Sequence, residues 1–134
     1  MATSKNEYFY GLGRRKSSTA RARLMGGKGT ITVNDKKAEE YFCGNEAYIA
    51  ELIQPLQLLG REKDFDISLK VDGGGLAGQV DASKLAISKA LSGMNDDLRG
   101  TLKKAGLLMR DPREKEPKKY GLRSARKREQ FSKR

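Results

Sequence analysis

Hydrophobic and polar residues alternate along three stretches of the chain, and each alternation predicts a strand. In residues 17–25 small apolar residues alternate with polar ones that include Arg21 and Arg23, which is the two-residue period of a half-buried strand. Residues 30–33 follow a glycine-rich turn, so we expect these two strands to pair as a hairpin. Residues 65–72 alternate most regularly. Each predicted strand therefore has one buried face and one solvated face.

Three helices are predicted where apolar residues recur three and four positions apart. Asn45 caps the first helix, which is expected to kink or end near Pro55 because proline has no amide donor. The second helix spans residues 76–94. The third follows Asn95, carries acidic residues in its first turn and lysines in its last, and stops at Gly106. The residues expected to face the core are Ile49, Leu52, Ile53, Leu56, Val80, Ile87, Leu91, Met94, Leu98, Leu102 and Ala105.

Several chemically versatile residues are assigned structural positions. Tyr8, Phe9 and Tyr10 have rings that stack on bases, but aromatic residues at strand spacing are more often core, and we place them there. Cys43 is expected to be a small buried hydrophobic residue. Acidic residues near the first helix are expected to form a solvated face without a catalytic pair. They are Glu39, Glu40, Glu46 and Glu51.

The order of these elements predicts an α+β fold in two layers, a small sheet with helices on one face. This globular domain is expected to occupy residues 1–109. Beyond Met109 the periodicity disappears, prolines interrupt the chain and apolar residues become sparse. Residues 110–134 are therefore expected to form a long, extended, basic C-terminal tail.

Composition restricts the chemistry. The 134 residues include no His and a single Cys. Without histidine a chain has no Ser-His-Asp triad and no imidazole metal ligand, and one cysteine forms neither an internal disulfide nor a thiolate zinc site. Any enzyme chemistry would therefore have to rest on carboxylates, lysines or a bound cofactor. Our expectation is that the chain has no catalytic residues, no metal and no cofactor. The polar residues after Met1 predict a soluble, cytoplasmic protein without a targeting or membrane segment.

Positive charge is the main functional signal. The chain has 28 Lys and Arg against 17 Asp and Glu, a net charge of +11. Residues 108–134 hold 11 basic and 4 acidic residues, a net of +7, and residues 8–34 hold six basic residues and no acid. A block of like charge repels itself unless a polyanion neutralises it. Nucleic acid is therefore the expected partner, either in an assembly or for a free-standing nucleic-acid-binding protein.

Two short motifs allow more than one interpretation. Residues 14–18 (RRKSS) are typical of a phosphate-binding cluster, a kinase site, a localisation signal or a solvated turn, and the cationic strand that follows favours phosphate contact. Gly73, Gly75 and Gly78 have the spacing of a dinucleotide-binding turn. Too few strands precede them and no Walker motif is present. Close backbone packing, or approach to an RNA backbone, is therefore favoured over a phosphate-substrate enzyme.

Four segments resemble the ninth small-subunit ribosomal protein family in its bacterial type. They are residues 11–21 (GLGRRKSSTAR), 73–79 (GGGLAGQ), 111–121 (DPREKEPKKYG) and 130–134 (QFSKR). The resemblance implies a β-α-β sandwich with a left-handed crossover, similar to the second domain of ribosomal protein five. It also implies a structural protein that binds ribosomal RNA in the small-subunit head beside neighbouring head proteins. Its tail would reach the anticodon stem-loop of peptidyl-site transfer RNA.

The charge pattern and the resemblance together assign roles to individual residues, since arginine forks and lysine charges hold phosphates without reading bases. Expected contacts with transfer RNA are Ser132, Lys133 and Arg134. Expected contacts with ribosomal RNA are Arg14, Arg15, Lys16, Arg21, Arg23, Arg110, Arg113, Lys118, Lys119, Arg123, Arg126, Lys127 and Arg128. Close backbone approach is expected at Gly73, Gly74, Gly75 and Gly78.

Overall fold

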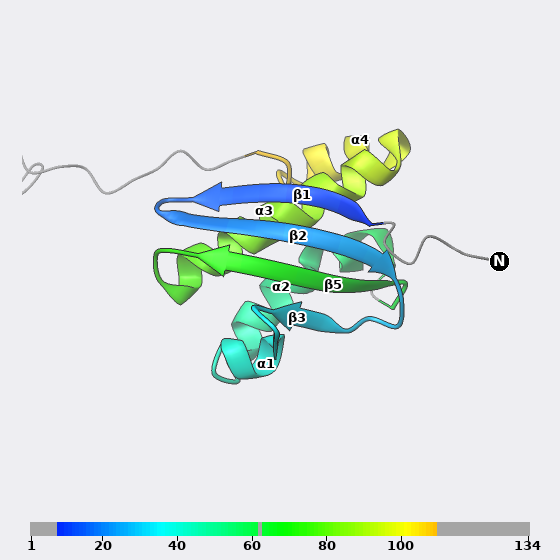
Figure 1. Cartoon of the computed structure of the whole chain (residues 1–134). Helices are drawn as coiled ribbons and strands as arrows, with labels where there is room; N and C mark the ends of the chain where they lie inside the picture. Colours follow the sequence, from blue (N-terminus) through cyan, green and yellow to red (C-terminus); the bar gives the residue numbers. More distant parts are fainter. Residues whose placement is uncertain (1–7, 62, 110–134) are drawn as a thin grey trace, which may run out of the picture.

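The sheet of this protein is covered by helices on one face (Figure 1). The structure, a computed structural model, describes residues 8–61 and 63–109. The expected tail, residues 110–134, lies outside the described residues. The elements are β1 (Phe9–Arg15), β2 (Ser18–Gly26), β3 (Ile31–Val33), β4 (Lys36–Lys37), α1 (Ala38–Tyr41), α2 (Glu46–Leu59), β5 (Phe65–Asp72), α3 (Leu76–Met94) and α4 (Asp96–Lys104). The expected two-layer α+β fold is confirmed.

Five strands form the sheet in the order β1-β2-β5-β3-β4. Neighbouring strands are antiparallel except β3 and β5, which run parallel. The chain leaves β3, passes through α1 and α2 behind the sheet in the view of Figure 1, and returns as β5. Both strands point left in this view and β5 lies above β3, so the connection is a left-handed crossover, as the resemblance implied.

The predicted pairing of residues 17–25 with residues 30–33 is wrong. β2 pairs with β1 on one side and with β5 on the other, and β3 lies on the far side of β5. The glycine-rich turn after β2 therefore carries the chain past the start of β5 instead of folding it back on itself. The hairpin that does form joins β1 and β2 through Lys16 and Ser17.

The inner face of the sheet consists of the apolar residues that alternate along its strands. Ala22 in β2 and Leu69 in β5 are register partners, and their exposed fractions are 0% and 1%. α3 lies against this face with its expected core residues Val80, Ile87 and Leu91 fully buried. Full burial of one such aliphatic side chain stabilises a fold by about 1.5–3 kcal/mol. The alternation and the helical stripe seen in the sequence therefore form the core as predicted.

The inward residues of β1 are glycines, so no side chain of β1 separates its backbone from that of α3. Gly11 and Gly13 are the inward positions of β1, and both are buried. A Cβ atom at Gly13 would overlap the carbonyl oxygen of Ala82, and one at Gly11 would overlap that of Ala86. The backbones of strand and helix are therefore in direct contact, which requires glycine at both strand positions.

The expected burial of Tyr8, Phe9 and Tyr10 is wrong, because their exposed fractions are 43%, 43% and 52%. Gly11 and Gly13 take the inward positions of this strand. The period of two then directs Tyr10 to the opposite, uncovered face of the sheet.

α2 begins as predicted and continues past Pro55. Asn45 caps it, because its Oδ1 accepts the Ala47 N–H at 3.0 Å. The helix ends only at Leu59, where Gly60 adopts a φ of 67°, so the expected end near Pro55 is wrong, whereas the alternative of a kink there stays a prediction. A buried proline ring packs in this helix interior at the cost of one backbone hydrogen bond. Leu52 and Leu56 are buried as expected, while Ile49 and Ile53 are only partly buried.

Cys43 is exposed, so its predicted burial is wrong. It lies in the turn between α1 and α2 with a φ of 56°, in the left-handed region of the backbone. α1 has only four residues, and a turn at this point places the thiol in solvent. The four carboxylates Glu39, Glu40, Glu46 and Glu51 are exposed, as expected.

α3 and α4 have the predicted bounds. Asn95 caps α4, since its Oδ1 accepts the Asp97 N–H at 3.0 Å. Leu102 is fully buried, but the expected burial of Ala105 is wrong. Gly106, with a φ of 75°, turns the chain after the last helical turn, and Leu107 takes the buried position at 6% exposure.

Asp66 organises the turn between β2 and β3. Its Oδ1 accepts the backbone N–H groups of Thr30, at 3.1 Å, and Lys28, at 3.0 Å. These bonds, the one from Thr30 foremost, lower the pKa of the Asp66 carboxyl below its usual range. The ionised carboxylate therefore stabilises the folded state.

Asp66→Asn is expected to lower the free energy of unfolding at pH 7, because the variant keeps an oxygen acceptor but loses the charge. A lowered folded pKa means that the stabilisation is present above the ordinary value of about 4 and is lost as pH falls through the folded pKa. Urea unfolding of wild type and variant at pH 7 and at about pH 3 measures it. A difference in stability that persists unchanged at the lower pH would contradict this explanation.

Candidate nucleic-acid interface

We call the uncovered face of the sheet the outer face. It carries the residues that alternate with buried ones in the three long strands. They are Tyr10, Leu12, Arg14, Thr19, Arg21, Arg23, Met25, Asp66, Ser68, Lys70 and Asp72. Strand register arranges them in rows, so that Leu12, Arg21 and Lys70 lie side by side across three strands. Cations far apart in the sequence are thereby brought together.

A small cavity of about 100 Å³ opens on the outer face. It is lined by Tyr10, Arg21, Arg23, Ser68 and Lys70. Three cations, a phenol and a hydroxyl thus converge, and among the described residues no carboxylate lines the cavity. Ligand pockets usually measure about 300–1,000 Å³, so this cavity suits one small anionic group such as a phosphate and is too small for a cofactor.

Arg21 and Lys70 carry like charges at directly opposed positions of neighbouring antiparallel strands. Such a pair has Cβ atoms about 5 Å apart and destabilises a sheet. Within the described part of the chain, no carboxylate forms an ion pair with either residue. An anion bound at this position would relieve the repulsion.

Aromatic rings border the same cations. The guanidinium carbon of Arg23 lies 5.0 Å from the ring centroid of Tyr8, within the range of a cation–π contact. Tyr10 is in register with Arg23 and is 52% exposed. Cations beside exposed rings are typical of surfaces that bind RNA, where phosphates pair with the charges and unpaired bases stack on the rings.

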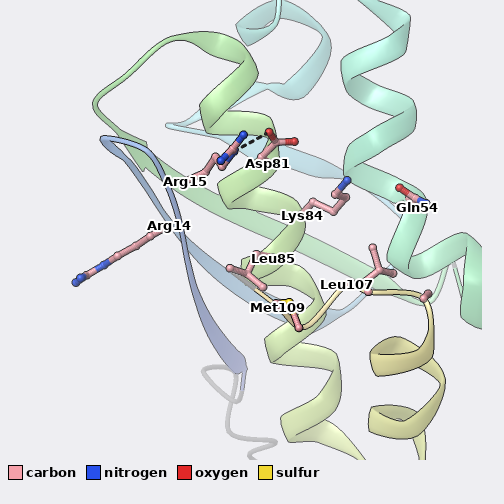
Figure 2. Close-up of a pocket in the computed structure, with 10 residues that line it drawn as sticks. Arg14, Arg15, Gln54, Asp81, Lys84, Leu85, Leu107 and Met109 are labelled. Atoms are coloured by element: carbon pink, nitrogen blue, oxygen red, sulfur yellow. Dashed lines mark hydrogen bonds and ion pairs between the residues drawn. The ribbon is translucent and has the colours of Figure 1, made fainter. Parts of the chain in front are cut away.

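The cationic cluster at residues 14–16 is divided between two sides of β1. Arg14 is exposed, and Figure 2 shows its side chain directed away from the helices. Arg15 points the other way, where its Nε lies 3.4 Å from Oδ2 of Asp81 in α3 and its side chain is 12% exposed. Lys16 is exposed in the β1–β2 turn. Arg14 therefore joins the outer face, whereas Arg15 contacts the helical layer.

Arg15 and Asp81 line a second cavity, of about 350 Å³, on the helical side of β1 (Figure 2). Lys84 of α3, Gln54 of α2 and Leu107 contribute to the same wall. Opposite charges and apolar groups are mixed in this cavity. It therefore differs from the small cavity on the outer face, whose charged lining residues are all cations.

The glycine-rich turn packs against the β1–β2 hairpin. Ser18 Oγ and Gln79 Nε2 both donate to the carbonyl oxygen of Gly73, each at 3.0 Å. Tyr41 in turn donates to Oε1 of Gln79 at 2.8 Å. Cβ atoms at Gly73 and Gly74 would overlap Ser17 and Ser18, and one at Gly78 would lie 2.9 Å from Ser18 Oγ, whereas Gly75 has open space beside it. Close packing within the protein therefore accounts for three of the four glycines, and RNA approach at Gly75 stays a prediction.

The other predicted contacts lie outside the described residues. They are Arg110, Arg113, Lys118, Lys119, Arg123, Arg126, Lys127, Arg128, Ser132, Lys133 and Arg134. Over residues 8–61 and 63–109 the structure has no group of three or more acidic or cysteine side chains placed to hold a metal ion. In the same ranges no helix is both long enough and apolar enough to span a membrane.

Sequence reasoning missed Lys70, Ser68 and Tyr10 as members of the cationic site. The alternation of residues 65–72 did place Ser68 and Lys70 on the solvated face of their strand. Only the register of β5 against β2 brings them beside Arg21 and Arg23, and that register has no local signal in the sequence.

Residues 13–134 match the family described as ribosomal protein S9/S16. The chain belongs to this family. Similar proteins include the small ribosomal subunit protein uS9 of Picosynechococcus sp., 50% identical over 133 residues that cover 99% of this chain and 97% of the relative. The uS9 protein of Prochlorococcus marinus is 50% identical over 135 residues, 100% of both chains. That of Nostoc punctiforme is 47% identical over 133 residues, 99% of this chain and 96% of the relative.

Membership of the ribosomal protein S9/S16 family decides between the interpretations of the glycine-rich turn. The family consists of structural ribosomal proteins and not of enzymes, so the phosphate-substrate enzyme is excluded. The match also includes the predicted tail, whose signature segments at residues 111–121 and 130–134 lie within it.

Proposed function

We propose that this chain is a structural protein of the small ribosomal subunit in the cytoplasm. It binds ribosomal RNA of the subunit head through the outer face and the basic tail. Its last three residues, Ser132, Lys133 and Arg134, contact the anticodon stem-loop of peptidyl-site transfer RNA. Neighbouring proteins of the head are further partners.

The opposed pair of Arg21 and Lys70 is the observation that carries the ribosomal RNA part of this proposal. Two cations in one row of the sheet, at a cavity without carboxylates, reduce the stability of the free protein. A phosphate at the cavity converts this repulsion into two charge-assisted contacts. Arg14 and Arg23 extend the same positive face, so a backbone that crosses the sheet meets a cation on each of several rows.

The tail supports the transfer RNA part. Residues 108–134 carry a net charge of +7, and the chain ends on two adjacent cations after a serine hydroxyl. Arginine forks and lysine charges bind phosphate oxygens in any sequence context, so this end would hold every transfer RNA alike.

Arg21→Gln and Lys70→Gln are each expected to weaken binding to a transcript of the head domain of small-subunit ribosomal RNA. The slope of log affinity against log salt should fall by about one unit for each lost phosphate contact. Lys70→Gln should also raise the stability of the free protein by a few tenths of a kcal/mol, because it removes the opposed like charge. Filter binding over a salt series and urea unfolding measure the two effects.

Lys103→Gln is the matched control, since it removes one exposed cation from α4 on the helical side. Its salt slope should equal that of wild type. If Arg21→Gln and Lys70→Gln have the same salt slope as Lys103→Gln and wild type, the outer face is not the RNA-binding surface. If the wild-type chain does not co-sediment with small subunits at moderate salt, a free-standing nucleic-acid-binding protein becomes the better description.

A further inference from the structure

A groove lies along α1 and the first half of α2, in the helical part of the fold. It encloses about 430 Å³ and is lined by Glu39, Gly44, Glu46, Ile49, Ala50 and Ile53. We call it the α1–α2 groove. Its volume falls within the range of about 300–1,000 Å³ that is typical of pockets for ligand-sized groups. None of its lining residues belongs to the outer face or to the expected RNA contacts.

The α1–α2 groove has an apolar floor that no other part of residues 8–61 and 63–109 covers. Leu52 and Leu56, on one side of α2, fill the core and are 0% and 1% exposed. Ile49 and Ile53, on the adjacent side, are only partly buried, and Ala50 beside them is exposed. Uncovered apolar residues within a polar rim are typical of surfaces that contact another protein.

The charged residues that line the groove are both acidic, opposite in sign to the net charge of the whole chain, and the nearest cations in the sequence are Lys36, Lys37 and Arg61, just outside residues 38–60. Residues 38–60 contain four Glu and no Asp, Lys or Arg, in a chain of net charge +11. All four glutamates are exposed, and two of them, Glu39 and Glu46, line the groove. An RNA backbone at this place would meet charges of its own sign, whereas a basic polypeptide would be attracted.

The α1–α2 groove and the outer face lie on different sides of the molecule. α2 is behind the sheet in Figure 1 and α1 is at its lower edge, while the outer face is turned toward the viewer. RNA bound to the outer face therefore leaves the groove accessible. Two partners of opposite charge are able to bind at the same time.

We propose that the α1–α2 groove docks a Lys- or Arg-rich segment of another protein of the small subunit, with an apolar side chain of that segment between Ile49 and Ile53. The glutamates at the rim pair with its cations. This proposal rests on the proposed function, because it places the partner in the small ribosomal subunit. It goes beyond RNA binding because it names a surface that binds protein and the chemistry of the segment bound there.

The test is a photocrosslink in assembled small subunits. Ala50→benzoylphenylalanine places a reactive ketone in the groove, and Glu51→benzoylphenylalanine places it on the same helix at a residue that does not line the groove. After irradiation, the subunits are isolated by sedimentation and the adducts are sequenced by mass spectrometry. We expect the Ala50 probe to capture a net basic segment of another protein, with at least a fivefold higher yield than the Glu51 probe.

Neutralisation of the rim gives a second readout. Glu39→Gln with Glu46→Gln should reduce the Ala50 crosslink at least threefold at low salt, and the reduction should shrink at high salt because screening weakens the attraction. Glu51→Gln should leave the yield unchanged. The proposal is overturned by an adduct on RNA, on this chain itself or on an acidic segment, and equally by no adduct in subunits that contain the probe. Co-sedimentation of the variants reports separately on the proposed function.

Discussion

Gly13→Ala is expected to reduce the free energy of unfolding by about 3 kcal/mol. The new methyl group would overlap the carbonyl oxygen of Ala82, and neither backbone can yield without moving a strand or a helix. For a domain of about this size that loss corresponds to a decrease in Tm of roughly 10–20 °C. Thermal unfolding followed by circular dichroism measures it.

Gly93→Ala is the control for this substitution. Gly93 lies in α3 like the alanines that β1 contacts, but a Cβ there would have nothing within 4 Å. The change should therefore raise the stability by at most about 0.5–1 kcal/mol, the value for glycine replaced in a helix interior, because Gly93 is next to the last residue of α3. A Gly13→Ala variant as stable as wild type would show that β1 and α3 are not in direct backbone contact.

Deletion of Ser132, Lys133 and Arg134 is expected to weaken peptidyl-site binding of transfer RNA about tenfold at low salt, which is roughly 1.4 kcal/mol. The reason is the loss of two cations from the proposed contact with the anticodon stem-loop. The salt slope should fall by about 1.4 to 1.8, and the loss should be similar for different transfer RNA species. Filter binding of several transfer RNAs to small subunits at a series of salt concentrations measures it.

A double substitution earlier in the tail separates this contact from assembly. Lys127→Gln with Arg128→Gln should loosen the chain from the subunit at moderate salt and leave transfer RNA binding to intact subunits unchanged. Deletion of residues 132–134 should instead weaken transfer RNA binding and leave the chain bound to the subunit at moderate salt. Equal transfer RNA affinity for full-length and shortened chains would refute the proposed role of the last three residues.

The elements with a complete local pattern were predicted with their bounds. Leu76–Met94 and Asp96–Lys104 have apolar stripes, and the side chain of Asn95 caps α4. Phe65–Asp72 shows strict alternation because one of its faces is buried and the other is not. Local signals of this kind depend only on neighbouring residues, so a single sequence contains them.

β1 could not be predicted in the same way, because its inward positions lack side chains. Gly11 and Gly13 leave space for the α3 backbone, so the hydrophobic alternation that normally marks a strand is missing. The strand's exposed aromatic residues, of which Tyr10 is one, were consequently placed in the core. The backbone of α3 occupies the space where inward apolar side chains of β1 would otherwise lie, and those side chains are what the alternation pattern consists of.

Only part of the candidate site could be predicted, because its remaining residues are brought in by contacts that are distant in the sequence. The alternation of their own strand identified Arg21 and Arg23 as outward cations. Lys70 and Ser68 belong to the same site only because β5, more than 40 positions further along the chain, lies between β2 and β3 in the sheet. The strand beside β2 is therefore β5, whereas the sequence predicts β3 there. The sequence has a glycine-rich turn at this point, and both the hairpin and the crossover are compatible with it.

The outer face and the α1–α2 groove, both within the described residues, differ in the sign of the charge that they present. Arg14, Arg21, Arg23 and Lys70 lie on the outer face, whereas residues 38–60, with four Glu and no Lys or Arg, lie behind the sheet and at its lower edge in Figure 1. A large polyanion is attracted by the first surface and repelled by the second before any atoms touch, so encounters that present α1 and α2 are disfavoured. Orientation during diffusion, and hence the rate of productive capture, should therefore depend on glutamates that never contact RNA.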